Sequence, residues 1–291
     1  MLKFRSVFFH LWPLHPKHRP KFVLNLGAQK SGTSWLHGTL KKHQNCELGL
    51  LKEYHIWDQW VPQEILGYDF NSAASWIDDA QQMLRQKMLQ DEEYYFNYFK
   101  NLISPAVRVT GDFTPNYSLL DKEKLQHLCW KLMDVGFDVV VVFLMRDPVD
   151  RCWSAFRSHY RDLDRELPTE ELIETFRAFY TSPQTVARTR YDEIISKLQS
   201  LETSKAPDGS KGDVSVVLQS YEQMMKGDVH TLANALSLGA ETLINSQVYN
   251  ASPIQSLPEN EIAECASFFA QTYAYCAAHH TDIAQHWRRT V

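Results

Sequence analysis

Residues 27–35, with the sequence GAQKSGTSW, combine the residue types of a phosphate-binding loop. Two glycines stand five positions apart, at Gly27 and Gly32. A buried strand that ends in such a loop and leads into a helix directs backbone N–H groups and the positive helix end at one point, which favours an anion. The common nucleoside-triphosphate loop carries its lysine directly after the second glycine. Here Thr33 stands there and Lys30 lies inside the loop. The pattern predicts a phosphate site of another kind, with a purely structural turn as the alternative.

A second candidate anion site follows the most apolar strand signal in the chain. The run DVVVVFLM, residues 138–145, is followed by RDPVDRCWSAFRSH, in which Arg146 leaves the strand and Ser154 lies eight positions later in a predicted helix. A guanidinium can donate two hydrogen bonds to one phosphate, and a serine hydroxyl can donate a third. The carboxyl ends of neighbouring parallel strands face one crevice, so we expect both loops to meet there. The alternative is a surface ion pair between Arg146 and Asp147.

Residues 50–58, with the sequence LLKEYHIWD, place acid–base groups among aromatic side chains. A hydroxyl that attacks an electrophile must lose its proton, and a carboxylate or an imidazole can accept it. The segment offers Lys52, Glu53, His55 and Asp58. It is therefore a candidate acceptor site, with a solvated loop as the alternative. Trp57 could stack on a sugar ring or an aromatic acceptor, and so could Trp60.

The elements that must position these groups alternate between strands and helices. The predicted strands are Phe22–Leu26, Ala106–Thr110, Asp138–Met145 and Val214–Leu218. The predicted helices are Ser34–His43, Ser75–Gln90, Asp91–Asn101, Asp121–Val135, Pro148–Tyr160, Thr169–Tyr180, Val186–Leu201 and Glu259–Ala278, and residues 204–213 read as a loop. This order predicts a single α/β domain with a central parallel sheet flanked by helices.

Composition limits the classes of function. The chain has 291 residues, 44% of them hydrophobic, and a net charge of −5, which argues against a general nucleic-acid binder. Five scattered cysteines without a CxxC motif predict neither a disulfide framework nor a metal site, and indicate the reducing cytoplasm. Residues 1–20 are basic and broken by His10 and Pro13, so they read as an exposed arm ahead of a domain at 21–291 and not as a membrane span.

The segments QKSGTSW and RDPVDRCWS together resemble the two cofactor motifs of sulfotransferases, which transfer a sulfuryl group from 3′-phosphoadenosine 5′-phosphosulfate (PAPS) to a hydroxyl or an amine. The resemblance implies the P-loop-like sulfotransferase fold and a cofactor that leaves as adenosine 3′,5′-bisphosphate, with no metal required. By this resemblance the 3′-phosphate binds Arg146 and Ser154, and Tyr191 lies nearby. The residues implied to hold the 5′ end and the adenine are Lys30, Ser31, Gly32, Thr33, Ser34 and Trp35.

The segment KEYHIWD is similar to one in the glycosaminoglycan (heparan sulfate) O-sulfotransferase branch. That similarity implies Glu53 as the general base, with His55 as the substitute, and an acceptor cleft formed by Lys52, His55 and Asp58. GDFTPNYS, residues 111–118, resembles the same branch but has Phe113 where lysine is usual. The late basic glycine loop of the family has no clear match; VYNASP at 248–253 is nearest in position and carries no lysine.

The resemblance implies direct in-line transfer, in which Glu53 accepts the hydroxyl proton while Lys30 neutralises charge on the leaving oxygen. It favours a carbohydrate hydroxyl as acceptor, with a phenol or a peptide tyrosine as alternatives. Two other classes remain open. Asp147 could hold magnesium in a P-loop kinase or NTPase, or the chain could be a non-catalytic nucleotide-binding relative. His127, His279 and His280 receive no role.

Overall fold

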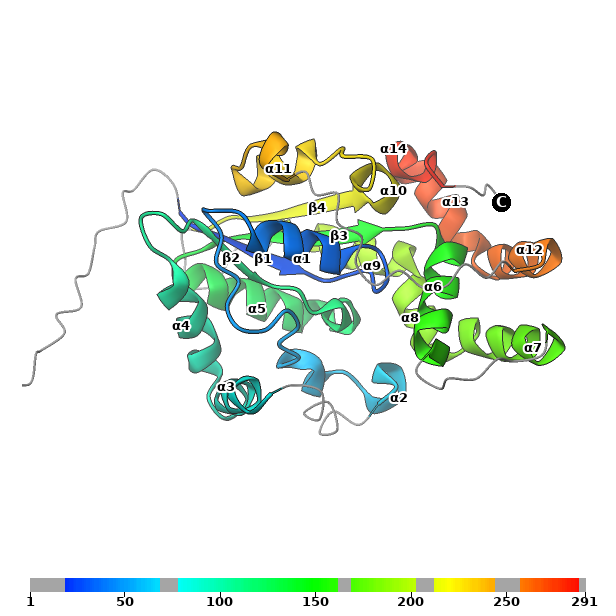
Figure 1. The fold of residues 1–291 in the computed structure, drawn as a ribbon, viewed down its shortest axis with the longest axis horizontal. Coiled ribbons are helices and arrows are strands. Elements are labelled where there is room, and N and C mark those ends of the chain that lie inside the picture. The colour runs from blue at the N-terminus through cyan, green and yellow to red at the C-terminus, as the bar shows by residue number, and fades with distance from the viewer. Residues whose placement is uncertain (1–18, 69–77, 162–168, 203–211, 244–256, 288–291) are drawn as a thin grey trace, which may run out of the picture.

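The computed structural model describes residues 19–68, 78–161, 169–202, 212–243 and 257–287. These residues form a single α/β domain built on one four-stranded parallel sheet with helices on both faces (Figure 1). The expectation for fold class is therefore confirmed. The predicted arm at 1–20 lies almost wholly outside the described residues, and the first strand starts at Lys21.

The sheet has the strand order β2–β1–β3–β4, with β1 Lys21–Asn25, β2 Val109–Asp112, β3 Asp138–Met145 and β4 Val214–Ser220. The chain passes from β1 to β2 on one side and then to β3 on the other, so the order reverses between β1 and β3. Asn25 pairs with Val142, and Met145 pairs with Ser220. The carboxyl ends of β1, β3 and β4 therefore meet along one edge, where ligands bind in open α/β sheets.

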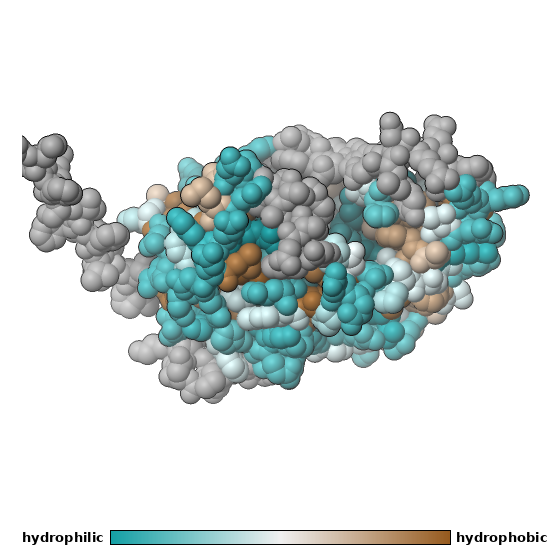
Figure 2. All heavy atoms as spheres, turned by 90° about the horizontal axis from the view of Figure 1, so that it is seen from below, coloured by the Kyte–Doolittle hydropathy of each residue, from teal (hydrophilic) through white to brown (hydrophobic). Residues whose placement is uncertain are grey.

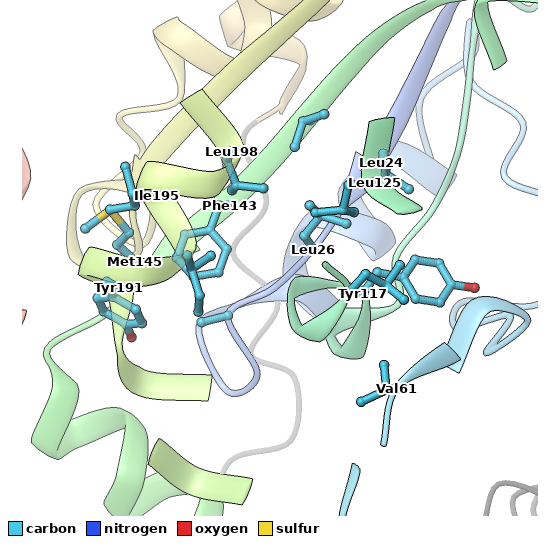
Figure 3. Close-up of a cluster of buried hydrophobic side chains, with 14 of the residues drawn as sticks. Leu24, Leu26, Val61, Tyr117, Leu125, Phe143, Met145, Tyr191, Ile195 and Leu198 are labelled. Carbon is cyan, nitrogen blue, oxygen red and sulfur yellow. The ribbon is translucent and has the colours of Figure 1, made fainter. Parts of the chain in front are cut away.

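Strand β3 separates two hydrophobic clusters because its side chains alternate between the two faces. Val140, Val142 and Leu144 face one cluster, which includes buried residues of α1 and α11. Val139, Val141, Phe143 and Met145 face the other, larger cluster, to which α4, α5 and α9 contribute. Figure 3 shows part of this larger cluster, with Phe143 between Tyr191, Leu198 and Leu26.

The helices agree with the predicted order. The longer ones are α1 Thr33–Lys41, α3 Asp79–Gln90, α4 Glu92–Leu102, α5 Lys122–Asp134, α6 Pro148–Arg161, α7 Thr169–Tyr180, α8 Pro183–Thr189, α9 Tyr191–Glu202, α11 His230–Leu236, α12 Glu259–Phe268 and α13 Ala270–His279. The sequence did not predict α11, nor the short elements η1 Trp57–Trp60, α2 Gln63–Leu66, η3 Pro115–Leu119, α10 Tyr221–Met224, η4 Ala240–Leu243 and α14 Thr281–Ala284.

Two helices expected to be continuous are each divided. The expected helix 186–201 breaks at Arg190, where ψ is 74°, so that α8 and α9 meet at an angle. The Arg190 guanidinium holds the start of α9 through Asp192, with Nη2–Oδ2 at 2.7 Å. The expected helix 259–278 breaks at Phe269, which is 1% exposed and has a ψ of 19°. In both places tertiary contacts override a continuous helical pattern.

Two element boundaries also differ from the sequence reading. The expected strand at 106–110 is found at Val109–Asp112, where it pairs with Lys21–Leu24. Helix α3 starts at Asp79, where Asp78 caps it: the Asp78 carboxylate accepts a hydrogen bond from the Gln81 backbone amide at 2.9 Å. Residues 75–77 of the expected helix lie outside the described residues. The predicted loop at 204–213 lies mostly outside the described residues.

The described residues hold no candidate membrane span and expose few large hydrophobic side chains. Among the described residues no helix is both long and apolar enough to cross a membrane. Figure 2 shows a mainly hydrophilic face with separate hydrophobic spots. The exposed large hydrophobic side chains of the described part are Leu50, Met83, Tyr94, Met225 and Phe268.

Candidate active site

The loop after β1 stays attached to β3 before it turns into α1. The Leu26 and Ala28 amides donate to the Val142 and Leu144 carbonyls at 3.0 and 2.9 Å. Lys30 and Gly32 then adopt left-handed backbone conformations, with φ of 68° and 91°. Gly32 is the N-cap of α1, and no side chain in the described part of the chain caps this helix. Its first amides are thus available to an anion.

Neighbouring side chains pack so closely against Gly32 that a larger residue would not fit there. A Cβ there would lie 2.6 Å from Met224 Cε and 3.0 Å from Tyr221 Cδ2. Next to it, Ser31 is completely buried, and its Oγ has no hydrogen-bond partner among the described residues. A buried hydroxyl without a partner costs free energy unless a ligand satisfies it. The residues of this loop therefore fit a phosphate or phosphosulfate group.

Arg146 connects the second motif to the first. Its Nη1 donates to the Lys30 carbonyl oxygen at 2.9 Å, and its guanidinium carbon lies 4.6 Å from the Tyr221 ring centroid. The Arg146 Nε is buried and makes no hydrogen bond within the described residues, so this atom can still bind an anion. The two motifs therefore lie in direct contact, and the prediction that they share one crevice stays a prediction.

The alternative of a surface ion pair between Arg146 and Asp147 is wrong. Asp147 is completely buried, and its Oδ1 accepts hydrogen bonds from the Val149 amide at 3.0 Å and the Tyr273 hydroxyl at 2.9 Å. It also accepts from the Asp150 amide at 3.2 Å. Asp147 thus caps α6, a role that explains its burial and gives no support to a magnesium-holding aspartate.

Helix α6 carries Ser154, which is 8% exposed, and one turn later Arg157. The Arg157 guanidinium carbon lies 5.6 Å from the centroid of the Trp153 ring. Burial and, next, the positive charge of Arg146 lower the pKa of Arg157. Arg146 and Arg157 are thus close enough for their positive charges to repel each other, an arrangement that an anion between them would stabilise. The sequence reading missed Arg157; its spacing of three from Ser154 on a helix was the available signal.

Tyr191 and Trp35, which the resemblance implies to lie at the cofactor, are both buried in the protein. Tyr191 is fully buried, and its hydroxyl donates to the Arg146 carbonyl oxygen at 3.0 Å, so it supports the strand end that carries Arg146. Trp35 is 6% exposed and belongs to the cluster on the α1 face of the sheet. Stacking of Trp35 on adenine stays a prediction.

The segment around Glu53 forms a continuous row of charges. Lys52 Nζ lies 2.5 Å from Glu53 Oε1, and His55 Nε2 lies 3.2 Å from Glu53 Oε2. On its other side, His55 Nδ1 lies 2.8 Å from Oδ2 of Asp58, which is completely buried. The structure thus brings together all four residues predicted for the acceptor site. The solvated-loop alternative does not describe this arrangement.

The protonation states follow from these contacts. Burial raises the pKa of Glu53, but the hydrogen bond from His55 and the charge of Lys52 outweigh it and lower this pKa from 4.5 to about 2. Burial lowers the pKa of His55, but its bonds to Asp58 and Glu53 outweigh that effect and raise the pKa from 6.5 to about 9. At neutral pH an imidazolium therefore lies between two carboxylates.

The backbone of this segment is held by the loop after β2. Thr114 Oγ1 accepts from the Tyr54 amide at 2.9 Å and donates to Asp112 Oδ1 at 2.6 Å. Tyr117 bridges the Ile56 amide and Asp112, at 3.0 and 3.1 Å. These bonds fix His55, whose φ is 54°, in a left-handed conformation. The GDFTPNYS segment thus fixes the backbone of residues 54–56 through hydrogen bonds.

His37 lies between α1, the helix after the Lys30 loop, and the segment of residues 52–58, which we call the acceptor segment. It lies on α1, and its ring centroid is 5.2 Å from that of Phe113, which is fully buried. The Phe113 amide donates to the Lys52 carbonyl at 3.2 Å. Burial and then the charge of Lys52 lower the pKa of His37 to about 4. The Lys52–Glu53 pair therefore lies beside α1, on the same part of the molecule as the phosphate loop.

Several other residues considered in the sequence analysis are not part of the candidate site. Trp57 is 1% exposed and packs on Tyr95 and Phe96, with ring centroids at 5.1 and 5.7 Å, so the prediction that it stacks on an acceptor is wrong. Trp60 is partly buried against Trp57. His127 pairs with Glu92 at 2.9 Å on the surface. Residues 248–253 lie outside the described residues, so the question of what closes the cofactor site stays open there.

No cluster for a metal ion occurs in the described ranges, where groups of three or more His, Cys, Asp or Glu side chains with suitable geometry are absent. All five cysteines are buried and unpaired by disulfides.

The sequence analysis also missed polar residues that pack against the acceptor segment or its partners, namely Tyr68, Arg85, Asn116 and Arg188.

Comparison with solved structures returns sulfotransferases, one of which has a similar fold. A sulfotransferase from Alicyclobacillus acidocaldarius is 20% identical, with a TM-score of 0.57, over 93% of this chain and 99% of that one. The sulfotransferase domain of the Synechococcus PCC 7002 olefin synthase is 15% identical, with a TM-score of 0.42, over 88% of this chain and 98% of that one. The comparison with curated proteins returns no match.

The family comparison covers most of the chain. The model described as "Sulfotransferase family" matches residues 22–237, a span that contains the phosphate loop, the acceptor segment and the Arg146 motif. These are the segments whose contacts form the site described above. The chain therefore belongs to the sulfotransferase family.

Proposed function

We propose that this chain transfers a sulfuryl group from PAPS to an acceptor hydroxyl, with Glu53 as the general base. The observation that carries the proposal is the 2.9 Å bond from Arg146 to the Lys30 carbonyl. This bond holds the Lys30 loop and the Arg146 segment side by side at the carboxyl ends of β1 and β3. One nucleotide with phosphates at both ends of its ribose can then contact both motifs.

The 5′ end of the cofactor would bind the loop of Lys30, Ser31 and Gly32 and the first turn of α1, which starts at Thr33 and Ser34. The 3′-phosphate would bind Arg146 and Ser154. When bound, PAPS supplies the sulfuryl group and carries away the bridging oxygen on adenosine 3′,5′-bisphosphate. Lys30 would neutralise the negative charge that develops on that oxygen, since electrostatic stabilisation is largest where charge appears.

Glu53 is better suited than His55 to accept the hydroxyl proton. His55 is protonated at neutral pH and has no free lone pair, whereas Glu53 is ionised. One Glu53 oxygen is bonded to His55 and the other to Lys52. We infer that the acceptor hydroxyl takes the place of Lys52 at Oε1. Glu53 regains basicity as Lys52 leaves, while His55 keeps the carboxylate oriented.

The proposed acceptor is a carbohydrate hydroxyl. This choice rests on the likeness of the KEYHIWD segment to the glycosaminoglycan O-sulfotransferase branch and on the partly exposed polar side chains of Lys52, Glu53 and His55. The deciding experiment is transfer of radiolabelled sulfate from PAPS to panels of oligosaccharides, glycolipids, tyrosine peptides and simple phenols. Tight binding of adenosine 3′,5′-bisphosphate without transfer to any panel would instead favour a non-catalytic relative.

A further inference from the structure

Asp58, at the buried end of the charged row, is held by a second set of polar groups. Its Oδ2 accepts from Tyr68 Oη at 2.6 Å and from Asn116 Nδ2 at 3.0 Å, in addition to His55. Asp58 has no solvent exposure, and Asn116 is 6% exposed. Asn116 bonds Asp58, Tyr68 and Arg188, and Tyr68 Oη also lies 3.5 Å from His55 Nδ1. These contacts link Asn116 to Glu53 through Asp58, Tyr68 and His55.

Arg188 determines which way the Asn116 amide faces. Arg188 Nη2 donates to Asn116 Oδ1 at 3.0 Å. A guanidinium has only donors, so it can be satisfied only by the amide oxygen. The Asn116 nitrogen must therefore point the other way, towards Asp58. The reversed amide would direct an oxygen at a buried carboxylate and a nitrogen at a cation.

The proton positions around Asp58 are then fully specified. Asn116 Nδ2 also lies 3.0 Å from Tyr68 Oη, which can only accept from it. Tyr68 must in turn give its own proton to Asp58. With three donors on Oδ2, Asp58 is the acceptor for His55, so the Nδ1 proton of His55 points to Asp58 and Nε2 points to Glu53.

Arg188 is itself anchored firmly. It is 8% exposed, and it also donates to the Ile65 and Leu66 carbonyls at the end of α2, at 3.1 and 2.9 Å. Burial lowers the pKa of Arg188 to about 10, which leaves it charged at neutral pH. The next residue, Thr189, accepts from Arg151 of α6 at 2.7 Å. Helix α8 thus contacts both the helix of Ser154 and the network behind Glu53.

We propose that Arg188 and Asn116 are positioning residues for sulfuryl transfer: Arg188 orients the Asn116 amide, and Asn116 holds Asp58 so that His55 keeps Glu53 aimed at the acceptor. The inference rests on the proposed function of Glu53. Buried polar networks of this kind transmit orientation because each member has one satisfied arrangement. A small displacement of a base can reduce the rate greatly.

The test is a double-mutant cycle with Asn116→Leu and His55→Ala, read by kcat with a panel-selected acceptor. We expect Asn116→Leu alone to lower kcat by roughly tenfold to a hundredfold, with the dissociation constant for adenosine 3′,5′-bisphosphate unchanged within about twofold. In the His55→Ala background the same substitution should change kcat by less than about twofold, because the residue it acts through is gone. A full additional loss in that background, or no loss in the single variant, overturns the proposal.

Gln184→Ala is the matched control. Gln184 lies on α8 and donates to the Glu64 carbonyl at 2.6 Å, so it also joins α8 to α2, but it does not contact Asn116. Its kcat should equal that of the wild type. If Asn116→Leu does not fold, Asn116→Asp keeps the size and the acceptor for Arg188 and exchanges only the donor that faces Asp58. It should show the same loss, with partial recovery at lower pH as the new carboxyl gains a proton.

A second readout separates this inference from the proposed function. If no acceptor is found, the proposed function fails, but the pKa of His55 can still be followed by NMR. Asn116→Leu should raise that pKa, because Asp58 loses one of three donors and binds the imidazolium more strongly. Gln184→Ala should leave it unchanged. An unchanged His55 pKa in folded Asn116→Leu overturns the positioning role.

Discussion

Arg146 donates a hydrogen bond to the main-chain oxygen of Lys30, across 116 residues of sequence, at a distance of 2.9 Å. The bond holds the loop at the residue whose backbone is left-handed, and so helps to fix where the Lys30 side chain starts. Arg146 also has a buried Nε available for an anion. A single guanidinium therefore supports the Lys30 loop and, in the proposed arrangement, also binds the 3′-phosphate.

Replacing Arg146 should weaken the binding of adenosine 3′,5′-bisphosphate. We expect Arg146→Ala to cost roughly 1.5–3 kcal/mol of binding free energy, the usual worth of hydrogen bonds to a charged group. Arg146→Lys should restore little, because an ammonium cannot both bond the Lys30 carbonyl and fork onto a phosphate. Isothermal titration calorimetry measures both. Wild-type affinity in folded Arg146→Ala would remove Arg146 from the site.

Arg157→Gln should lose affinity only for ligands that carry the 3′-phosphate. Arg157 is close enough to Arg146 for its pKa to be lowered by that charge, and a phosphate between them would relieve the repulsion. We expect roughly a tenfold weaker binding of adenosine 3′,5′-bisphosphate, about 1.4 kcal/mol, and no change for adenosine 5′-phosphate. The control is Lys100→Gln, which removes the same positive charge from an exposed position on α4. Equal losses for the two nucleotides would place Arg157 elsewhere.

The glycine loop between β1 and α1, strand β3 and the start of α6 could be predicted from the sequence because each is a local pattern. A β-branched run, a glycine loop and a helix start follow one another directly, and backbone sterics do the rest. The breaks at Arg190 and Phe269 were missed because no glycine or proline marks either place. They exist because Asp192 pairs with Arg190 and because Phe269 is buried.

In the acceptor segment too, local residues could be predicted from the sequence, but their distant partners could not. The types and spacing of Glu53, His55 and Asp58 suggested acid–base chemistry, and the structure joins them in one row. The support from Asn116 and Arg188 comes from segments 60 to 130 residues further along the chain, roughly, and no local pattern announces such contacts. Trp57 was misassigned for a similar reason, because the partners that bury it, Tyr95 and Phe96, lie on α4.

Glu53→Gln should separate chemistry from cofactor binding. The amide keeps the size of the side chain but cannot accept the hydroxyl proton, so we expect kcat to fall by about a hundredfold or more. Binding of adenosine 3′,5′-bisphosphate should stay within about twofold of the wild type, since Glu53 contacts neither phosphate motif in the proposed arrangement. Steady-state transfer of labelled sulfate together with calorimetry provides both values. Near-normal turnover would exclude Glu53 as the base.

The charged row should make stability depend on pH in two opposite ways. The folded-state pKa of His55 is raised to about 9, so its stabilisation is fully present below about 6.5 and is lost as the pH rises through about 9. The pKa of Glu53 is lowered to about 2, so its stabilisation is present above about 4.5 and is lost as the pH falls through about 2. The row therefore stabilises the fold most between these windows.

His55→Gln tests the upper window. Its stability deficit relative to the wild type should be largest near pH 6, as much as roughly 3 kcal/mol, and should shrink by pH 9.5. Urea unfolding at both pH values measures the difference. A deficit that stays constant with pH would mean that His55 is not held as an imidazolium between Glu53 and Asp58.

Gly32→Ala should damage cofactor binding beyond its effect on stability, and Gly227→Ala allows the two to be separated. Both glycines have left-handed backbones, with φ of 91° and 92°. A Cβ at Gly227 meets nothing within 4 Å, whereas one at Gly32 comes within 3.0 Å of the Tyr221 ring and closer still to Met224 Cε. Each variant should lose about 1–2 kcal/mol of unfolding free energy from backbone strain.

Only Gly32→Ala should weaken binding of adenosine 3′,5′-bisphosphate, because only there does the new methyl group push the Met224 end and the Tyr221 ring into the cradle that faces Arg146. We expect at least a tenfold loss of affinity for Gly32→Ala and less than a twofold loss for Gly227→Ala, with urea unfolding used to match their stabilities. If both variants bound the nucleotide as tightly as the wild type, the phosphate would have to lie away from Gly32, and the loop would be a structural turn.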